Sequence, residues 1–141
     1  MDRPRHSDGR VHGAIVGCHR HDGCWLLIRR SQQVAAPGQV CFPGGAIEPG
    51  EERITAAMRE LREELSLEVK ILNLVWRHDF ADRPLTLWGY LGTIGSQTPI
   101  PDGEEVDEAI WMTTNQVRTC SAVMARTCEF LDALLETTGD T

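Results

Sequence analysis

The chain has 141 residues, a formal net charge of −7 and a charged fraction of 25%. This length predicts one domain with its own hydrophobic core. The acidic balance argues against a protein that binds nucleic-acid polymers or membrane surfaces, because such proteins are usually basic. An anionic substrate remains compatible with this charge if a bound cation supplies local positive charge.

Five cysteines, an odd number without a Cys-x-x-Cys pair, argue against a disulfide framework or a zinc ribbon. Free thiols are typical of a reducing compartment, so a cytoplasmic location is expected. Residues 1–10 lack the apolar segment of a secretion signal and are predicted to form a flexible tail, whose three arginines would otherwise be a weak anion-binding arm. Residues 11–141 are predicted to form the single domain, and no apolar run reaches the length of a membrane span.

Strands are predicted wherever alternating or β-branched apolar residues lie between turn residues. In chain order these segments are residues 11–18, 25–29, 40–42, 69–78, 85–94 and 106–112. Asp22-Gly23 is a hairpin signal between the first two strands. The two histidines of that turn, His19 and His21, are interpreted as turn residues rather than metal ligands, because no third ligand has suitable spacing.

Two helices are predicted, over residues 51–65 and from about residue 121 to residue 135. In the first helix the apolar residues on one stripe, which is expected to face the core, are Ile54, Ala57, Met58, Leu61 and Leu65. Glu63 falls nearly opposite this stripe, and Glu60 and Glu64 lie one turn apart on one flank. This acidic cluster is open to two interpretations: a solvated helix face, or a site for a hard divalent cation that binds carboxylate oxygens.

The spacing around these carboxylates resembles the Nudix box, G-x5-E-x7-R-E-U-x-E-E-x-G-U with U apolar. The matching residues of the 23-residue segment are Gly45, Glu51, Arg59, Glu60, Leu61, Glu63, Glu64 and Leu67. Ser66 stands where the family has its last glycine. That position follows the helix, where a left-handed backbone is common, and serine adopts this conformation at a cost of about 1 kcal/mol.

The resemblance to the Nudix hydrolases implies an α/β fold, an α/β/α sandwich with a mixed central sheet. It implies hydrolysis of a diphosphate bond in a nucleoside diphosphate linked to another group, with Mg²⁺ or Mn²⁺ as cofactor. A small nucleotide, such as a modified nucleoside triphosphate in MutT-like enzymes, is the expected partner, and a homodimer is considered. The rival interpretation is a nucleotide-sensing module of the same fold that does not hydrolyse its ligand.

The resemblance also implies roles for individual residues. Glu60, Glu63 and Glu64 are expected to bind the metal, with a backbone carbonyl from Gly44 or Gly45. Arg59 is expected to orient a glutamate, and Glu51 to hold the loop and helix in register. Glu104 and Glu105 are the candidates for a general base, with Glu108 as a structural alternative. The candidates for substrate binding are Arg29, Phe42, Trp88 and Tyr90, although aromatic residues of this kind are also common in cores.

Overall fold

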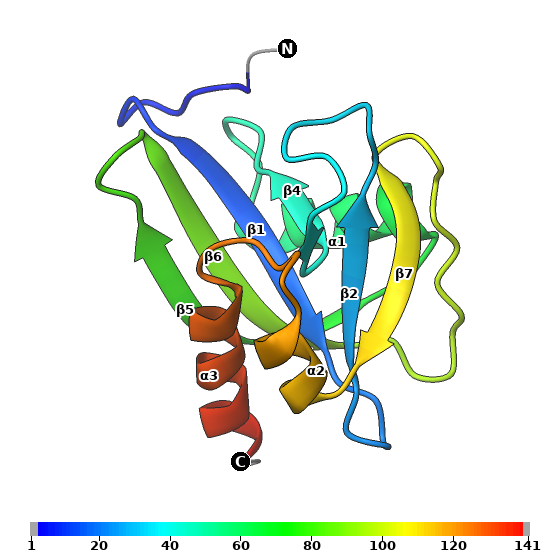
Figure 1. Ribbon diagram of the computed structural model, residues 1–141. Coiled ribbons are helices and arrows are strands. Elements are labelled where there is room, and N and C mark those ends of the chain that lie inside the picture. Colours follow the sequence, from blue (N-terminus) through cyan, green and yellow to red (C-terminus); the bar gives the residue numbers. More distant parts are fainter. Residues whose placement is uncertain (1–2, 140–141) are drawn as a thin grey trace.

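The computed structural model describes residues 3–139 as an α/β structure (Figure 1). Its strands are β1 (Val11–Cys18), β2 (Trp25–Arg30), β3 (Val40–Cys41), β4 (Gly44–Ala46), β5 (Lys70–Asp79), β6 (Leu85–Thr93) and β7 (Val106–Met112). Its helices are α1 (Arg53–Leu65), α2 (Thr114–Thr119) and α3 (Thr127–Thr138). The six predicted strands are confirmed, and β4 is an additional short strand.

The strands form two sheets. The first has the order β4-β1-β6-β5 and is mixed, because β1 runs parallel to β6 while the other pairings are antiparallel. The second sheet, β3-β2-β7, is antiparallel throughout. The first sheet is therefore the mixed sheet of the expected sandwich, and the second extends the structure beside it.

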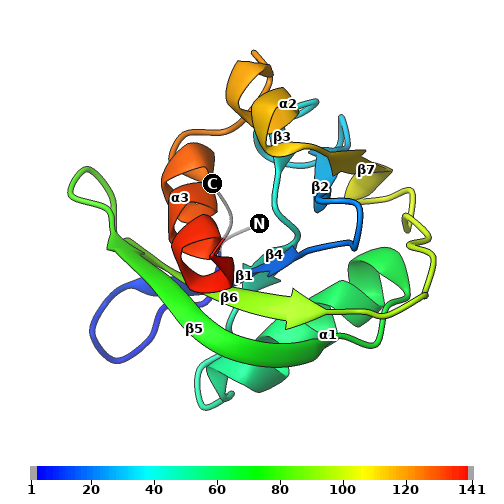
Figure 2. The ribbon, with the colours of Figure 1, turned by 90° about the horizontal axis from the view of Figure 1, so that it is seen from below.

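Helices cover both faces of the mixed sheet, as Figure 2 shows for α1 and α3. On the face of α1, the core includes Ala14 and Val16 from β1. On the face of α3, the helix approaches the sheet so closely that a Cβ at Gly17 would overlap the side chain of Leu134. Two separate cores result, one on each face of the sheet.

The face that α1 buries confirms most of the predicted stripe, since Ala57, Leu61 and Leu65 are buried and Met58 packs against the core, but it differs at Ile54 and in two glutamates. Its buried residues are Ala56, Ala57, Glu60, Leu61, Glu64 and Leu65. Ile54, which was predicted to face the core, is 47% exposed. The helix is thus turned so that two glutamates point into the protein, which a rule based on apolar residues alone does not anticipate.

Ser66 follows α1 in the left-handed conformation, with φ +56° and ψ +36°. Its N–H bonds carbonyl oxygens of the last helical turn, so the residue ends the helix as the family's glycine would. The backbone expectation for this position is therefore confirmed, although the side chain departs from the pattern.

The helices of the C-terminal region differ from the single helix that was predicted there. The predicted start near residue 121 is wrong, because α3 begins at Thr127. The preceding residues instead bring Val123 beside Val40 as a parallel bridge. Helix α2 was not predicted, although Thr113 and Gln116 form a capping box at its start.

The segment before β1 is packed over residues 5–10 rather than free. Arg10 donates hydrogen bonds to the carbonyl oxygens of Phe80 and Leu85 at 3.0 and 2.6 Å. Within residues 3–139, no helix is both long and apolar enough to cross a membrane. The five cysteines, Cys18, Cys24, Cys41, Cys120 and Cys128, are free thiols, as expected.

Replacing Leu61 with Ala is expected to lower the free energy of unfolding by about 2–5 kcal/mol, because its side chain is fully buried and a cavity would remain. Denaturant unfolding measures this change. Ile54→Ala on the same helix is the matched control, and its effect should be much smaller because that side chain is half exposed. Equal effects of the two substitutions would contradict the orientation of α1.

Candidate active site

The two buried carboxylates of α1 lie against β4, the strand before the helix. Glu60 and Glu64 are only 9% and 4% exposed. A Cβ at Gly45 would overlap the carboxylate of Glu60, so this approach requires glycine. Gly44 has φ +150° and donates its N–H to Oε1 of Glu64 at 3.2 Å. The glycine pair therefore lets the backbone of β4 reach both carboxylates.

Arg59 connects the acidic residues at this end of the helix. Its Nε and Nη2 donate to the two carboxylate oxygens of Glu51 at 2.9 and 3.0 Å, a bidentate arrangement. Its Nη1 donates to Glu60 at 3.0 Å and to Glu63 at 3.3 Å, and Nη2 also reaches the carbonyl oxygen of Ala46 at 3.0 Å. The Arg59 guanidinium lowers the pKa of Glu51 and ties the loop before α1 to the helix.

A loop outside the box brings a third carboxylate to this site. Asp102 donates its N–H to the carbonyl oxygen of Glu64 at 2.9 Å, and its Oδ1 accepts from the N–H groups of Glu104 and Glu105 at 3.0 and 3.1 Å. Ser31, which is buried, holds the other side of the loop by donating its hydroxyl to the Glu104 carbonyl and its N–H to the Glu105 carbonyl. The loop is therefore fixed both to α1 and to the end of β2.

Glu60, Glu64 and Glu105 each offer a carboxylate oxygen, and these three atoms lie within 4.8 Å of one another. Burial raises the pKa of Glu64 to about 9, and the charges of Glu60 and Glu105 add to this effect. Burial also raises the pKa of Glu60, although Arg59 opposes the shift. The three groups thus repel one another when all are ionised.

The chemistry of this donor set fits a hard divalent cation. Carboxylate oxygens are the ligands that Mg²⁺ and Mn²⁺ prefer, and a cation would offset the repulsion among them. Glu105 is exposed while its two partners are buried, so the cluster is open to solvent on one side. A substrate phosphate and water can approach from that side.

Two carboxylates expected at the site lie outside this cluster. The side chain of Glu63 is 59% exposed and bonds Arg59. Glu104 is exposed and shares the loop, but it is not a member of the group of three. Of the two candidates for a general base, the structure therefore brings Glu105 to the buried pair.

Arg29 does not lie on the face of the carboxylate cluster. Alternation along β2 places Arg29 on the face opposite to that of Leu26 and Ile28, which belong to the core on the side of α1. Arg29 donates to Glu108 at 3.2 Å and to the carbonyl oxygen of Gly38 at 2.9 Å. Its expected role in substrate binding is therefore not supported, and Glu108 has the structural role that was the alternative.

Arg30 takes the place expected for Arg29. It lies opposite Val106, which belongs to the core on the side of α1. Burial raises the pKa of the nearby Cys41 thiol to about 11, with Arg30 opposing the shift and Glu64 adding to it. Arg30 and Cys41 thus lie at the site. The sequence alone did not single out Arg30, because alternation along β2 does not show which of its faces meets α1.

Phe42 belongs to the core rather than to a substrate surface. It is 3% exposed and packs edge-on against Trp25 and Phe130, with ring centroids 6.5 and 4.9 Å away. The assignment of Phe42 to substrate binding is therefore wrong. Its position after β3 directs the ring toward the face covered by α3.

Trp88 and Tyr90 are also occupied by protein partners. Both lie on β6, which β1 separates from β4. The Trp88 ring centroid is 3.8 Å from Cζ of Arg53 and 4.5 Å from Cζ of Arg77, while the indole N–H donates to His12. Tyr90 is 3% exposed, and its hydroxyl accepts from Arg53. Neither ring presents a free face to a nucleobase here.

Comparison with known proteins agrees with this fold. Residues 10–132 match the model of the NUDIX domain family. The chain is 33% identical over 100 residues to an 8-oxo-dGTP diphosphatase of Escherichia coli (strain K12), covering 69% of this chain and 76% of that protein. It is 41% identical over 64 residues to the nucleoside triphosphatase NudI of Salmonella newport (strain SL254), covering 45% of each.

Solved structures share the fold at lower identity. The MutT protein of Methanosarcina mazei Go1 superimposes with a TM-score of 0.77 at 17% identity, covering 98% of both chains. A NUDIX hydrolase of Nitrosomonas europaea gives a TM-score of 0.79 at 16% identity, covering 99% of this chain and 76% of that one.

The fold and the carboxylate-bearing helix thus define a nucleotide pyrophosphohydrolase. The chain belongs to the NUDIX family. It hydrolyses a diphosphate bond in a nucleoside diphosphate derivative, the reaction expected from the box.

Proposed function

We propose that the chain hydrolyses a nucleoside triphosphate to a monophosphate and pyrophosphate, using Mg²⁺ or Mn²⁺ held by Glu60 and Glu64, with Glu105 beside them. The main support is the convergence of three carboxylate oxygens within 4.8 Å, two of them buried, where a bound cation would offset the repulsion among their ionised forms. The names of two relatives, one for 8-oxo-dGTP and one for nucleoside triphosphates, favour this substrate class.

Glu60 and Glu64 hold the ion in this proposal, because they are buried on a rigid helix. Gly44 and Gly45 keep β4 close to them and are the source of an added backbone carbonyl ligand. A bound divalent ion neutralises the diphosphate and lowers the pKa of a bound water. Arg59 orients Glu60, and Glu63 stabilises Arg59 from the solvent side.

Glu105 accepts the proton of the attacking water, since it is the exposed member of the cluster and lies on a fixed loop. The water oxygen bonds to one phosphorus, the bridging P–O bond breaks, and the leaving product takes the electron pair. Arg30, on the same face, pairs with phosphate oxygens.

Release of phosphate or pyrophosphate with Mg²⁺ tests the substrate class. The panel contains nucleoside triphosphates including 8-oxo-dGTP, together with ADP-ribose, NADH, coenzyme A and dinucleoside polyphosphates. Pyrophosphate release from triphosphates, with weaker activity on the rest, is the expected result. Saturable nucleotide binding without any product would instead support the sensing module.

Stabilisation by metal is expected to grow with pH. Glu64 keeps its proton up to a pKa of about 9 when folded, but loses it near 4.5 when unfolded. The folded state therefore binds more protons in this window, and the metal-free protein loses stability as pH rises through it. Metal binding removes this proton, so added Mg²⁺ should raise the melting temperature more at about pH 8.5 than at about pH 6.

Thermal melts with EDTA or with saturating Mg²⁺ at both pH values measure this difference. Glu64→Gln is the matched variant, because it has no proton to release at this position. A metal-induced shift that is equal at both pH values in the unmodified protein would contradict a titrating Glu64 at the metal site.

A further inference from the structure

Residues 5–10 cross the loop that leads into α1, although the sequence predicted a flexible tail. His6 places Nε2 2.8 Å from the carbonyl oxygen of Ile47. Because a carbonyl oxygen only accepts, this nitrogen carries the proton and donates it. The N–H of Ile47 in turn donates to the carbonyl oxygen of His12 at 2.8 Å. Both backbone groups of Ile47 are therefore bound by the N-terminal part of the chain.

The side chain of His12 makes a second connection from the N-terminal segment to the box helix. The indole N–H of Trp88 donates to Nδ1 of His12 at 3.0 Å, so Nε2 carries the proton and donates to Asp8 at 2.8 Å. The Trp88 ring also stacks against the guanidinium of Arg53, the first residue of α1. The path from Asp8 through His12 and Trp88 thus ends at the start of the box helix.

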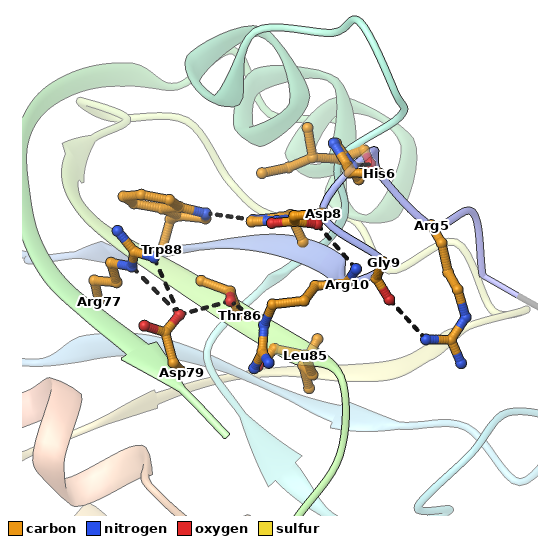
Figure 3. Close-up of polar contacts among 12 residues, drawn as sticks. Arg5, His6, Asp8, Gly9, Arg10, Arg77, Asp79, Leu85, Thr86 and Trp88 are labelled. Carbon is orange, nitrogen blue, oxygen red and sulfur yellow. Dashed lines mark hydrogen bonds and ion pairs between the residues drawn. The ribbon is translucent and has the colours of Figure 1, made fainter. Parts of the chain in front are cut away.

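The segment is itself held at the start of β6, where Arg10, Leu85 and Thr86 are labelled in Figure 3. Arg10 donates from Nε to the hydroxyl of Thr86 at 2.9 Å, besides its two bonds to carbonyl oxygens. That hydroxyl donates to Asp79 at 2.7 Å, and Asp79 pairs with Arg77 at 3.3 Å. Because the segment is held in place, its contacts can fix the position of the loop that leads into α1.

The N-terminal segment thus reaches two residues on either side of Glu51 in the sequence, Ile47 and Arg53, which are its two anchors. Glu51 binds Arg59 through both carboxylate oxygens, and Arg59 reaches Glu60 in the carboxylate cluster. A shift of the turn between the anchors would move Glu51, and with it the partner that orients Glu60. Glu51, which lies between the two anchors, is thus two hydrogen bonds from a proposed metal ligand, through Arg59 to Glu60.

We propose that His6 is a positioning residue for catalysis, and that the segment His6–His12 fixes the turn containing Glu51 so that Glu60 keeps the geometry for binding metal. The proposal rests on the metal site described under the proposed function. The segment takes part in no chemical step of this proposal.

Three variants of the full chain test this proposal by the dissociation constant of Mn²⁺, by kcat and by the KM of the nucleotide. His6→Ala removes the donor to Ile47, and His6→Gln restores one, because its amide nitrogen can donate to the same oxygen. Arg5→Ala is the control, since its guanidinium bonds only the exposed Gly9 carbonyl among the hydrogen bonds described. The melting temperature is recorded for each variant.

His6→Ala is expected to weaken Mn²⁺ binding on the order of 10-fold, as for residues that orient metal ligands. The KM of the nucleotide at saturating metal should stay unchanged, and His6→Gln should recover most of the Mn²⁺ affinity. Unchanged Mn²⁺ affinity in His6→Ala, with or without a lower melting temperature, would overturn the proposal. Unchanged Mn²⁺ affinity in Glu64→Gln would instead reject the metal site itself.

Discussion

Replacing Glu64 with Gln is expected to lower turnover on the order of 10³-fold while the protein remains folded. The variant loses a buried anionic ligand, and charge stabilisation by a metal is worth several kcal/mol in the transition state. Turnover of the best nucleotide substrate at saturating Mg²⁺ measures the loss. The dissociation constant of Mn²⁺ should rise in parallel, because the same oxygen is removed from the metal site.

The fold should tolerate this substitution because burial already raises the pKa of Glu64 to about 9. At neutral pH the metal-free side chain is thus protonated, and the Gln amide matches its shape and lack of charge. Gly44 can still donate its N–H to the remaining carbonyl oxygen. Normal turnover in Glu64→Gln would contradict the assignment of Glu64 as a metal ligand.

Glu63→Gln is the informative comparison on the same helix. Its side chain is 59% exposed, and its only bond among those described is the long one to Arg59. We expect a much smaller loss of turnover than for Glu64→Gln. Equal losses would restore Glu63 to the set of metal ligands that the family pattern implies. Glu68→Gln, an exposed site outside the box, should leave turnover unchanged.

The strands could be predicted from the sequence because each depends on local alternation between turn residues. The apolar stripe likewise predicted the burial of Ala57, Leu61 and Leu65 on α1, but it could not predict that Glu60 and Glu64 are buried beside them. Gly45 was the available signal: a residue without a side chain beside a buried carboxylate allows close approach. Local patterns thus predict where a helix lies more readily than which polar residues it buries.

The residues predicted to bind substrate lie away from the carboxylate cluster for a different reason. Alternation along β2 puts Arg29 and Arg30 on opposite faces, and the sequence alone does not show which face meets α1. An aromatic residue such as Phe42 or Tyr90 can stack on a nucleobase or pack in the core, and the sequence alone does not distinguish the two roles. Their contacts depend on strands and helices distant in the chain, which only the folded structure brings together.

Replacing Glu105 with Gln is expected to lower kcat by about 10²–10⁴-fold, the usual contribution of a general base. The carboxylate lies on a loop that Asp102 and Ser31 hold in place, and the amide substitution leaves their bonds to the backbone intact. Because Glu60 and Glu64 remain to bind the ion, Mn²⁺ affinity should change little. The combination of a low kcat with retained metal affinity is therefore the expected result.

Glu104→Gln is the matched control, since Glu104 precedes Glu105 on the same fixed loop but is not a member of the carboxylate cluster. Its kcat should stay near that of the unmodified protein. Loss of Mn²⁺ affinity in Glu105→Gln would reassign this carboxylate from proton acceptor to metal ligand. A larger loss of kcat in Glu104→Gln than in Glu105→Gln would contradict the orientation of the loop. The two variants together separate the residue that accepts the proton from those that hold the metal.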